Sequence, residues 1–261
     1  RFQAFSLRLD SAQADADRDY GEKCGPAHAW TAVAAMGEIW QSCHGTPHRS
    51  IEQRMTEPAD YVDSHYRRSL SDQWRWRPLG RDLKAEVCVV GGGLAGLNTA
   101  LGLAERDRQV VLLEGKRAGW GASGRNGGFV MAGFALPAQR LAARISLSRA
   151  RSLHAMTVEA LSLIRTRIDD FDIDCGPVQD GIVVAGWHGS GQAIKRHASF
   201  LRKEMGTPVE YWPGEKLRQM YRTDRYVDAV FDPTAFHLHP LNFTRGIARA
   251  ADRAGVVLHE D

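Results

Sequence analysis

The feature that most constrains this chain runs from Glu86 to Glu114, with the sequence EVCVVGGGLAGLNTALGLAERDRQVVLLE. It begins with a β-branched apolar run at residues 87–90, which has the length and composition of a buried parallel strand. A glycine-rich turn follows, then a segment with helical spacing, then a second apolar run that ends at Glu114. The pattern predicts two parallel strands joined through a tight turn and a helix, which is a βαβ unit.

The turn fits the pattern G-x-G-x-x-G and consists of Gly91, Gly92, Gly93, Leu94, Ala95 and Gly96. Three positions of this turn require a residue without a side chain. Gly91 allows a sharp turn, Gly93 allows a ligand to approach closely, and Gly96 allows the helix to pack closely. The N-terminus of the helix, at Leu94 and Ala95, offers unpaired N–H groups to phosphate. Glu114 lies at the spacing of about 20 residues from which an acid accepts hydrogen bonds from a ribose. The unit therefore predicts a dinucleotide site.

Composition excludes several other classes of function. The chain has 261 residues, of which 43% are hydrophobic and 25% charged, as in ordinary soluble globular proteins. Its net charge of +3 is too small to indicate nucleic acid as a partner, and no apolar run is long enough to span a bilayer. We expect a cytoplasmic protein with a small-molecule substrate; its oligomeric state is not predicted.

The cysteines indicate neither a metal site nor a disulfide framework. They are Cys24, Cys43, Cys88 and Cys175, without metal-ligand spacing, and this usage suits a reducing cytoplasm. Cys88 is expected to point into the sheet as a small hydrophobe, and Cys175 to be structural. No metal is predicted.

The first part of the chain differs from the rest. It starts at Arg1 and shows little periodicity over residues 1–54, which we interpret as a disordered or spurious extension, with Met55 as the natural start. The alternative is a genuine but poorly ordered extension. Residues 55–84 then form an extended, partly helical lead-in, in which Trp74 and Trp76 are expected to pack on the body of the protein or, alternatively, to shield a substrate cavity.

Further elements follow from periodicity. A long amphipathic helix is expected at residues 146–170, with a core stripe that comprises Leu153, Met156, Thr157, Ala160, Leu161, Ile164 and Ile168. The remaining expected elements are strands at 181–185, 209–212 and 226–231, helices at 191–205 and 242–254, and a strand that starts at Val256.

A long glycine-rich loop at residues 115–128 directly follows the second strand, and such loops are more often functional than idle. Lys116 and Arg117 suggest a 2′-phosphate site, but Glu114 beside them would repel that group, so we interpret both as surface charges.

From this loop the sequence resembles a known family. Residues 87–130, which include GASGRNGG, resemble the FAD-dependent oxidoreductases of the D-amino-acid oxidase and glycine oxidase type, and among them most the γ-glutamylputrescine oxidoreductases. The likeness extends from about Met55 to the end, through residues 172–175 and 237–242. It implies an α/β fold with a Rossmann-like FAD-binding βαβ core and an α+β substrate domain. Members of the family continue well past the point that matches Asp261, so the chain is expected to be incomplete at the C-terminus.

The resemblance implies FAD rather than NAD as the cofactor. By that likeness the loop residues that contact FAD are Ala122, Ser123, Arg125, Asn126, Gly127 and Gly128. Arg125 either offsets phosphate charge or is a solvated arginine, and Asn126 orients the loop through hydrogen bonds to its own backbone. Gly127 and Gly128 let the flavin ring lie close.

The resemblance also implies domain limits and a reaction. Residues 85–150 form the FAD-binding part, 151–240 the substrate-domain part, and 241–261 return to the FAD-binding domain. The reaction is oxidation of a C–N bond of an amine or amino acid, γ-glutamylputrescine-like, by hydride transfer to flavin N5. The alternatives are a glycine- or sarcosine-type amine oxidase and an inactive FAD-binding fragment. A NAD-dependent dehydrogenase would leave GASGRNGG unexplained.

No catalytic residue is predicted, because this hydride transfer requires no dedicated base. His237 and His239 share one side of an extended segment, but no Asp, Glu or Cys completes a metal site at their spacing. Pro240 suits a helix start, so we expect a structural role at a strand-to-helix junction, with a substrate-facing role as the alternative.

Overall fold

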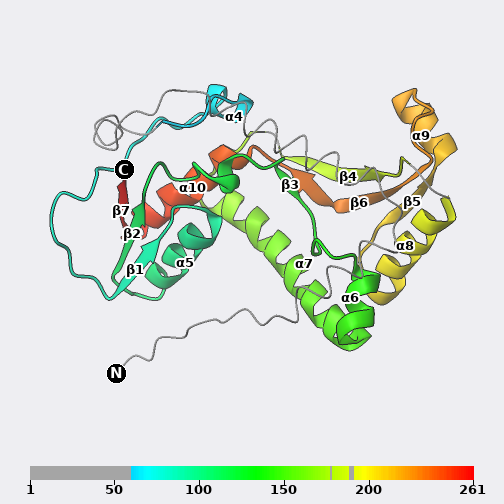
Figure 1. The fold of residues 1–261 in the computed structure, drawn as a ribbon, viewed down its shortest axis with the longest axis horizontal. Coiled ribbons are helices and arrows are strands. Elements are labelled where there is room, and N and C mark those ends of the chain that lie inside the picture. Colours follow the sequence, from blue (N-terminus) through cyan, green and yellow to red (C-terminus); the bar gives the residue numbers. More distant parts are fainter. Residues whose placement is uncertain (1–59, 177, 188–190) are drawn as a thin grey trace, which may run out of the picture. The chain divides into compact units, whose positions relative to one another are not determined.

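The computed structural model describes residues 60–176, 178–187 and 191–261, so the expectation for residues 1–54 lies outside the described residues. The described chain builds two β-sheets with helices packed on them (Figure 1). This confirms the α/β class, with a parallel sheet formed by the predicted βαβ unit.

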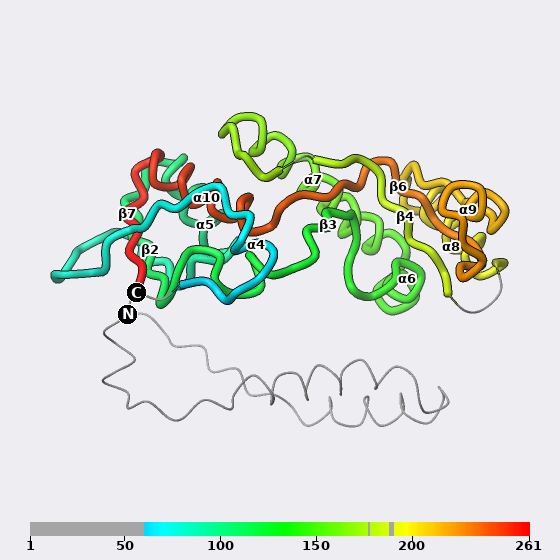
Figure 2. The backbone as a smooth tube through the Cα atoms, turned by 90° about the horizontal axis from the view of Figure 1, so that it is seen from above, coloured from blue at the N-terminus to red at the C-terminus, as the bar shows by residue number. Residues whose placement is uncertain are grey.

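The first sheet has the strand order β1-β2-β7, all parallel, and its strands are β1 (Val87–Val90), β2 (Val110–Glu114) and β7 (Val257–Glu260). Helix α5 (Leu94–Ala104) connects β1 to β2, and α10 (Pro240–Arg253) precedes β7. The two helices contact each other, and both views show them side by side (Figures 1 and 2).

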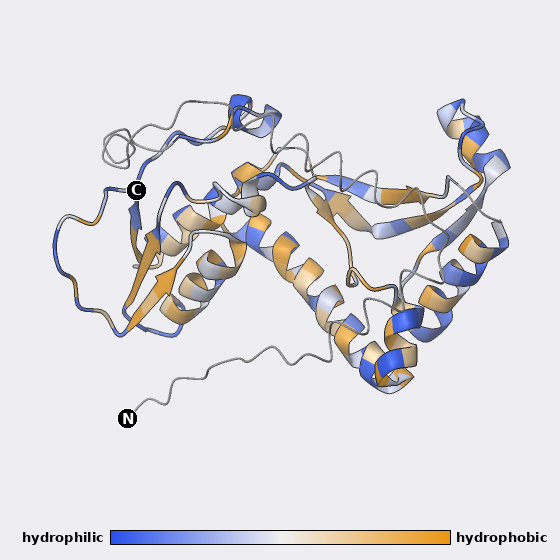
Figure 3. Ribbon diagram, viewed as in Figure 1, coloured by the Kyte–Doolittle hydropathy of each residue, from blue (hydrophilic) through white to orange (hydrophobic). Residues whose placement is uncertain are grey.

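The main hydrophobic core lies between this sheet and its helices. Leu112 of β2 and Leu97 of α5 are completely buried, as is Ile247 of α10. Figure 3 shows β1 and β2 as hydrophobic along their lengths, as expected for strands of a parallel sheet. Burial of α10 is extensive because its apolar residues also contact the lead-in and the long helix.

The second sheet is built around one long strand, which pairs antiparallel with each of the other three. Its strands are β3 (Phe129–Val130), β4 (Gln179–Ala185), β5 (Glu210–Pro213) and the central β6 (Asp228–His237). Residues 129–130, expected in the FAD-binding part, therefore pair with a strand of the second sheet. The domain limits stay a prediction.

The two faces of the second sheet carry different helices. Helix α8 (Gly191–Glu204) packs through Ala198 on the face of Val230. Helix α9 (Gly214–Tyr221) packs through Leu217 on the opposite face, beside Ala229. Alternate residues of β6 thus point to opposite sides, as strand geometry requires.

Four further helical segments lie in the described chain. Helix α4 (His65–Arg68) belongs to the lead-in before β1, and the other three lie between the strands β2 and β4: the 3₁₀ turn η1 (Ala122–Gly124), α6 (Ala138–Ile145) and α7 (Leu147–Asp170). Helix α7 confirms the predicted long helix. Its stripe is only partly core, because Leu161 is buried while Ala160 is exposed and Met156 is 61% exposed. The expectation that the whole stripe is core is wrong, since α7 packs along its length on different neighbours.

Strand β6 continues past Phe231, where the sequence pattern ends it. Pro233 has no N–H for a ladder, yet the strand passes it through a shift in register, with Ile182 opposite Asp232 and Asp180 opposite Phe236. The Asp232 side chain accepts hydrogen bonds from the N–H groups of Thr234 and Ala235, so both backbone donors of this irregular segment have a partner.

Two expectations for single side chains have different outcomes. Cys88 is exposed and Val90 is 83% exposed, so the prediction that Cys88 points into the sheet is wrong. The reason is that helices cover one face of β1, where Val89 packs, and leave the other face open. Cys175 and Trp76 are buried in the core as expected, while Trp74 is half-exposed. Among the described residues, no helix has the length and apolar character needed to cross a bilayer.

Candidate cofactor site

The turn between β1 and α5 takes its shape from two positions without side chains. Gly91 has φ of +105° and donates its N–H to the Leu113 carbonyl at 2.7 Å. Side chains rarely tolerate this backbone conformation. A Cβ on Gly96 would overlap the carbonyl oxygen of Gly91. The helix therefore begins close against the end of β1.

The N-terminus of α5 presents donors at this turn. Gly93 is the N-cap, and the N–H groups of the first turn have no acceptor within the helix. The N–H of Leu94 donates to the hydroxyl oxygen of Ser123 at 3.0 Å. The first-turn N–H groups of Ala95 and Gly96 lie at the positive end of the helix dipole, where an anion is stabilised.

The Glu114 carboxylate is held against the same turn. Its Oε2 accepts from the N–H of Gly92 at 2.6 Å, and its Oε1 accepts from the N–H of Lys116 at 2.9 Å. Each carboxylate oxygen has a second lone pair, so both can also accept from a sugar hydroxyl. The turn and the end of β2 thus form one acceptor site beside the helix N-terminus.

Ser123 brings the glycine-rich loop to the helix. Because its Oγ accepts from Leu94, the hydroxyl hydrogen is left to donate to a ligand. Its carbonyl accepts from the Asn126 side chain at 2.9 Å and from the hydroxyl of Thr244 at 3.2 Å. Thr244 lies fully buried in α10, so the loop is anchored to a core helix.

The end of the loop is fixed by close backbone contacts. The Asn126 side chain also accepts from the N–H of Gly128 at 2.8 Å, which matches its expected role in orienting the loop. Gly128 has φ of +72°, and a Cβ there would overlap the carbonyl oxygen of Leu238. His237 donates from Nε2 to the Gly127 carbonyl at 3.0 Å.

Arg125 lies on the exposed side of the loop. Its guanidinium stacks over the Trp120 ring at 4.7 Å, and its Nε donates to the Gly121 carbonyl at 3.3 Å. Its contact with phosphate stays a prediction.

A cavity of about 280 Å³ opens where these parts meet. Four of the predicted residues line it, namely Leu94, Ser123, Asn126 and Gly128. The remaining wall is apolar and is formed by Phe129, Val130, Met131, Ile164, Leu238, Pro240 and Phe243. Donors at a helix terminus beside an apolar wall suit a group that carries both phosphate and a flat ring, as FAD does. The residues present therefore fit this cofactor.

A second cavity, of about 370 Å³, adjoins the first along the face of the second sheet that carries α9. Phe129 lines both cavities and is 66% exposed. Its ring meets that of His237 edge to face, with centroids 5.4 Å apart. Tyr221 and Tyr226 add further aromatic wall, so we name this cavity the aromatic groove.

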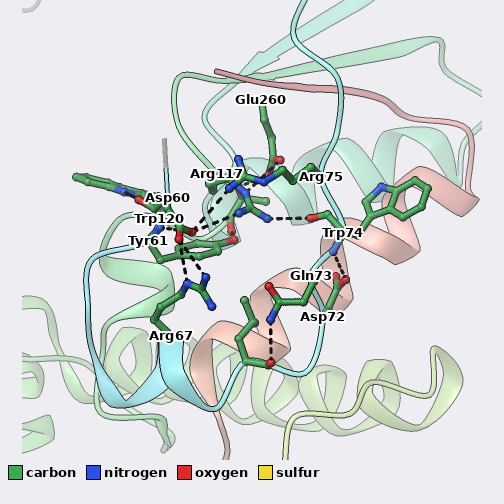
Figure 4. A network of polar contacts seen from close by, with 12 residues as sticks. Asp60, Tyr61, Arg67, Asp72, Gln73, Trp74, Arg75, Arg117, Trp120 and Glu260 are labelled. Carbon is green, nitrogen blue, oxygen red and sulfur yellow. Dashed lines mark hydrogen bonds and ion pairs between the residues drawn. The ribbon is translucent and has the colours of Figure 1, made fainter. Parts of the chain in front are cut away.

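Arg117, Arg245 and Glu260 belong to an ionic network that the sequence did not indicate, and Figure 4 shows Arg117 and Glu260 within it. Arg117 is 3% exposed, lies 3.4 Å from the Glu260 carboxylate and donates to the Trp74 carbonyl, so its prediction as a surface charge is wrong. Arg245 is completely buried and pairs with Asp72 at 3.0 Å and with Glu260 at 3.7 Å. Buried arginines require such partners.

The two histidines make different contacts. His239 accepts the N–H of Asn242 at Nδ1, which caps α10, and its Nε2 lies 3.1 Å from the Ser69 hydroxyl. Its expected position at a strand-to-helix junction is confirmed, since β6 ends at His237 and α10 starts at Pro240. In the described part of the chain, no group of three His, Cys, Asp or Glu could hold a metal ion.

Sequence reasoning missed Thr244 and Phe129 as parts of the site. Thr244 has no local signal, because its partner Ser123 is distant in sequence. Phe129 directly follows the glycine pair, and an aromatic residue at that position was the available signal.

Comparison with known proteins agrees with this geometry. The family described as FAD dependent oxidoreductase (DAO) matches residues 86–261. The chain is 33% identical over 202 residues to the probable oxidoreductase OrdL of Haemophilus influenzae and 32% identical over 201 residues to the γ-glutamylputrescine oxidoreductase of Escherichia coli. Each match covers 77% of this chain and 47% of the relative, so the chain spans about half the length of the curated relatives it matches.

Solved structures agree on the fold. The L-amino acid deaminase of Proteus myxofaciens has a TM-score of 0.57 at 20% identity, over 77% of this chain and 41% of that one. The glycine oxidase of Bacillus cereus has a TM-score of 0.51 at 22% identity, over 68% of this chain and 46% of that one.

Proposed function

Because this chain belongs to the DAO family of FAD dependent oxidoreductases, we propose that it holds FAD at the turn of residues 91–96 and serves the oxidation of a C–N bond in an amine or amino acid. The observation that carries the proposal is the arrangement of three groups around one glycine turn. The N-terminus of α5 and the Ser123 hydroxyl border the cofactor cavity, and the Glu114 carboxylate accepts from the N–H of Gly92 in the same turn. Each provides the kind of hydrogen bond that a different part of FAD requires.

The roles divide along the cofactor. Glu114 would accept from the adenosine ribose, while the Ser123 hydroxyl and the backbone at Gly93, Leu94, Ala95 and Gly96 would bind the pyrophosphate. The loop residues Ala122, Asn126, Gly127 and Gly128 would border the flavin, and Arg125 would lie near the phosphates. When bound, the flavin supplies an acceptor for the hydride that leaves the carbon next to nitrogen.

The aromatic groove is the proposed place of the substrate. It adjoins the cofactor cavity at Phe129, and its aromatic rings can offer their faces to an amine. We propose a γ-glutamylputrescine-like amine, since a relative with that name is 32% identical to the chain. The proposed compartment is the cytoplasm, where cysteines stay reduced.

The test uses protein expressed from its native gene. Purified protein should be yellow, and anaerobic addition of γ-glutamylputrescine should bleach the flavin absorption. Glycine and sarcosine serve as the comparison amines. Bleaching by those two alone would overturn the substrate proposal, and a colourless protein that takes up no added FAD would overturn the whole proposal.

A further inference from the structure

A third cavity lies on the opposite face of the second sheet from the aromatic groove. Its volume is about 280 Å³, and its walls come from β4, β6, the segment 131–138 and helices α6, α7 and α8. Val230 and Asp232 of β6 line it, whereas Ala229 and Phe231 belong to the cluster on the α9 face. We name it the helix-side cavity.

The helix-side cavity has an apolar wall with a few buried polar groups. Asp232 is 6% exposed, and His154 and Thr207 are each 5% exposed. Most other lining residues are alanine, leucine, valine, phenylalanine or proline. This composition is typical of small-molecule sites, in which a few placed polar groups fix the ligand orientation.

Asp232 has an unused oxygen. Its Oδ1 accepts from the Thr234 N–H at 2.9 Å, the Thr234 hydroxyl at 2.6 Å and the Ala235 N–H at 3.3 Å. Within residues 60–176, 178–187 and 191–261, Oδ2 accepts no hydrogen bond and Asp232 forms no ion pair with lysine or arginine. A buried carboxylate is costly without a cationic partner, so the cavity favours a ligand that brings positive charge.

The histidines do not supply that charge. Burial lowers the pKa of His197, and it lowers the pKa of His154 despite the opposite effect of the nearby Asp232 charge. Both shifts favour neutral imidazoles. His197 Nδ1 lies 3.0 Å from the Gln139 side-chain oxygen and donates to it, which leaves Nε2 as an acceptor. The cavity is thus rich in acceptors, and its ligand must bring donors.

We infer that the helix-side cavity binds a compact alkylammonium compound, with the ammonium at Asp232 and the hydrocarbon chain against the apolar wall. An ammonium group carries three donors and no acceptor, which matches the groups that converge here. The inference rests on this cavity alone and does not depend on FAD.

The first test compares two probes on the full chain by isothermal titration calorimetry. Hexylammonium chloride should bind saturably, and 1-hexanol, which has the same carbon chain and no charge, should bind at least about tenfold more weakly. The inference is overturned if hexylammonium does not bind, or binds no more tightly than hexanol.

The second test locates the binding. Asp232→Asn keeps the Oδ1 acceptor that holds Thr234 and removes the charge, so hexylammonium affinity should fall by at least about tenfold. Asp180→Asn makes the same charge change at an exposed position of the same sheet and should leave the affinity unchanged. Ala138→Leu places a larger side chain in the cavity and should weaken both probes.

Circular dichroism checks that each variant is folded. Unchanged hexylammonium affinity in folded Asp232→Asn, or in folded Ala138→Leu, contradicts the inference. If the Asp232→Asn variant does not fold, the inference is decided by the affinities of hexylammonium and hexanol for the unmodified chain.

Discussion

At the scale of single residues, the candidate site depends on what glycine permits and on what one carboxylate accepts. Gly96 lets α5 begin against the carbonyl of Gly91, and Glu114 joins the turn to the end of β2. These contacts are short and local, and each can be removed by one substitution. They therefore give the sharpest tests of cofactor binding.

Glu114→Gln should raise the Kd of FAD by about tenfold or more, because an amide replaces a charged acceptor for the ribose and for two backbone N–H groups. Quenching of flavin fluorescence on titration measures it. Glu159→Gln, an exposed change on α7, is the matched control. Equal affinity in the two variants would contradict the role of Glu114.

Gly96→Ala should destabilise the chain by about 1–3 kcal/mol and abolish FAD binding, because the new Cβ overlaps backbone. Gly102→Ala in the same helix is the control. Its Cβ would lie 3.5 Å from the Arg106 guanidinium, an ordinary contact, so it should stabilise by about 0.5–1 kcal/mol. Urea unfolding measures the stability of both variants. A Gly96→Ala variant that is as stable as the unmodified chain and still binds FAD would contradict the role of Gly96 in the turn.

At the scale of elements, buried charges connect segments that are far apart in sequence. Glu260 of β7 accepts from the N–H of Trp76 in the lead-in at 3.1 Å and from that of Ala118 in the loop at 2.7 Å. Its carboxylate also faces Arg117 and Arg245. The Glu260 side chain thus holds the lead-in and the loop against the edge strand of the first sheet through hydrogen bonds.

Glu260→Gln should lower the free energy of unfolding by about 3–5 kcal/mol, because it leaves two buried arginines without that charge. Glu204→Gln removes an exposed partner of Arg151, 2.6 Å away, and should cost less than about 1 kcal/mol. Urea unfolding compares them. Similar losses in both variants would show that the network contributes little.

At the scale of the whole molecule, one buried histidine, His154, and two partly buried ones, His197 and His239, make stability depend on pH. Burial lowers the pKa of His154, His197 and His239 below 6.5, the ordinary value. The unfolded chain therefore takes up protons at a pH where the folded chain does not, so the stability that these residues contribute is present above pH 6.5 and is lost as the pH falls below it.

Unfolding by urea at about pH 7.5 and about pH 5.5 should show this loss, and His154→Gln should reduce it, since glutamine does not titrate. Constant stability across the range would contradict the lowered pKa values. So would an undiminished loss in the His154→Gln variant.

How far the sequence predicts this molecule depends on the range of the interactions. The βαβ unit, α7 and α10 follow from local periodicity and from glycine and proline positions, so they were predictable. The sequence pattern ends β6 at Phe231, because the continuation of the strand past Pro233 depends on the Asp232 side chain. The burial of Arg117 depends on Glu260, which is more than 140 residues away, near the C-terminal end of the described chain.

The two-residue strand β3 has a thermodynamic consequence. It follows the glycine loop directly, and Phe129 and Val130 pair with His237 and Phe236 of the second sheet. Phe129 lines both the cofactor cavity and the aromatic groove, so a ligand in either one would lie against this same segment. Linkage is reciprocal, so whatever factor a bound amine imposes on the dissociation of FAD, FAD imposes on the dissociation of that amine.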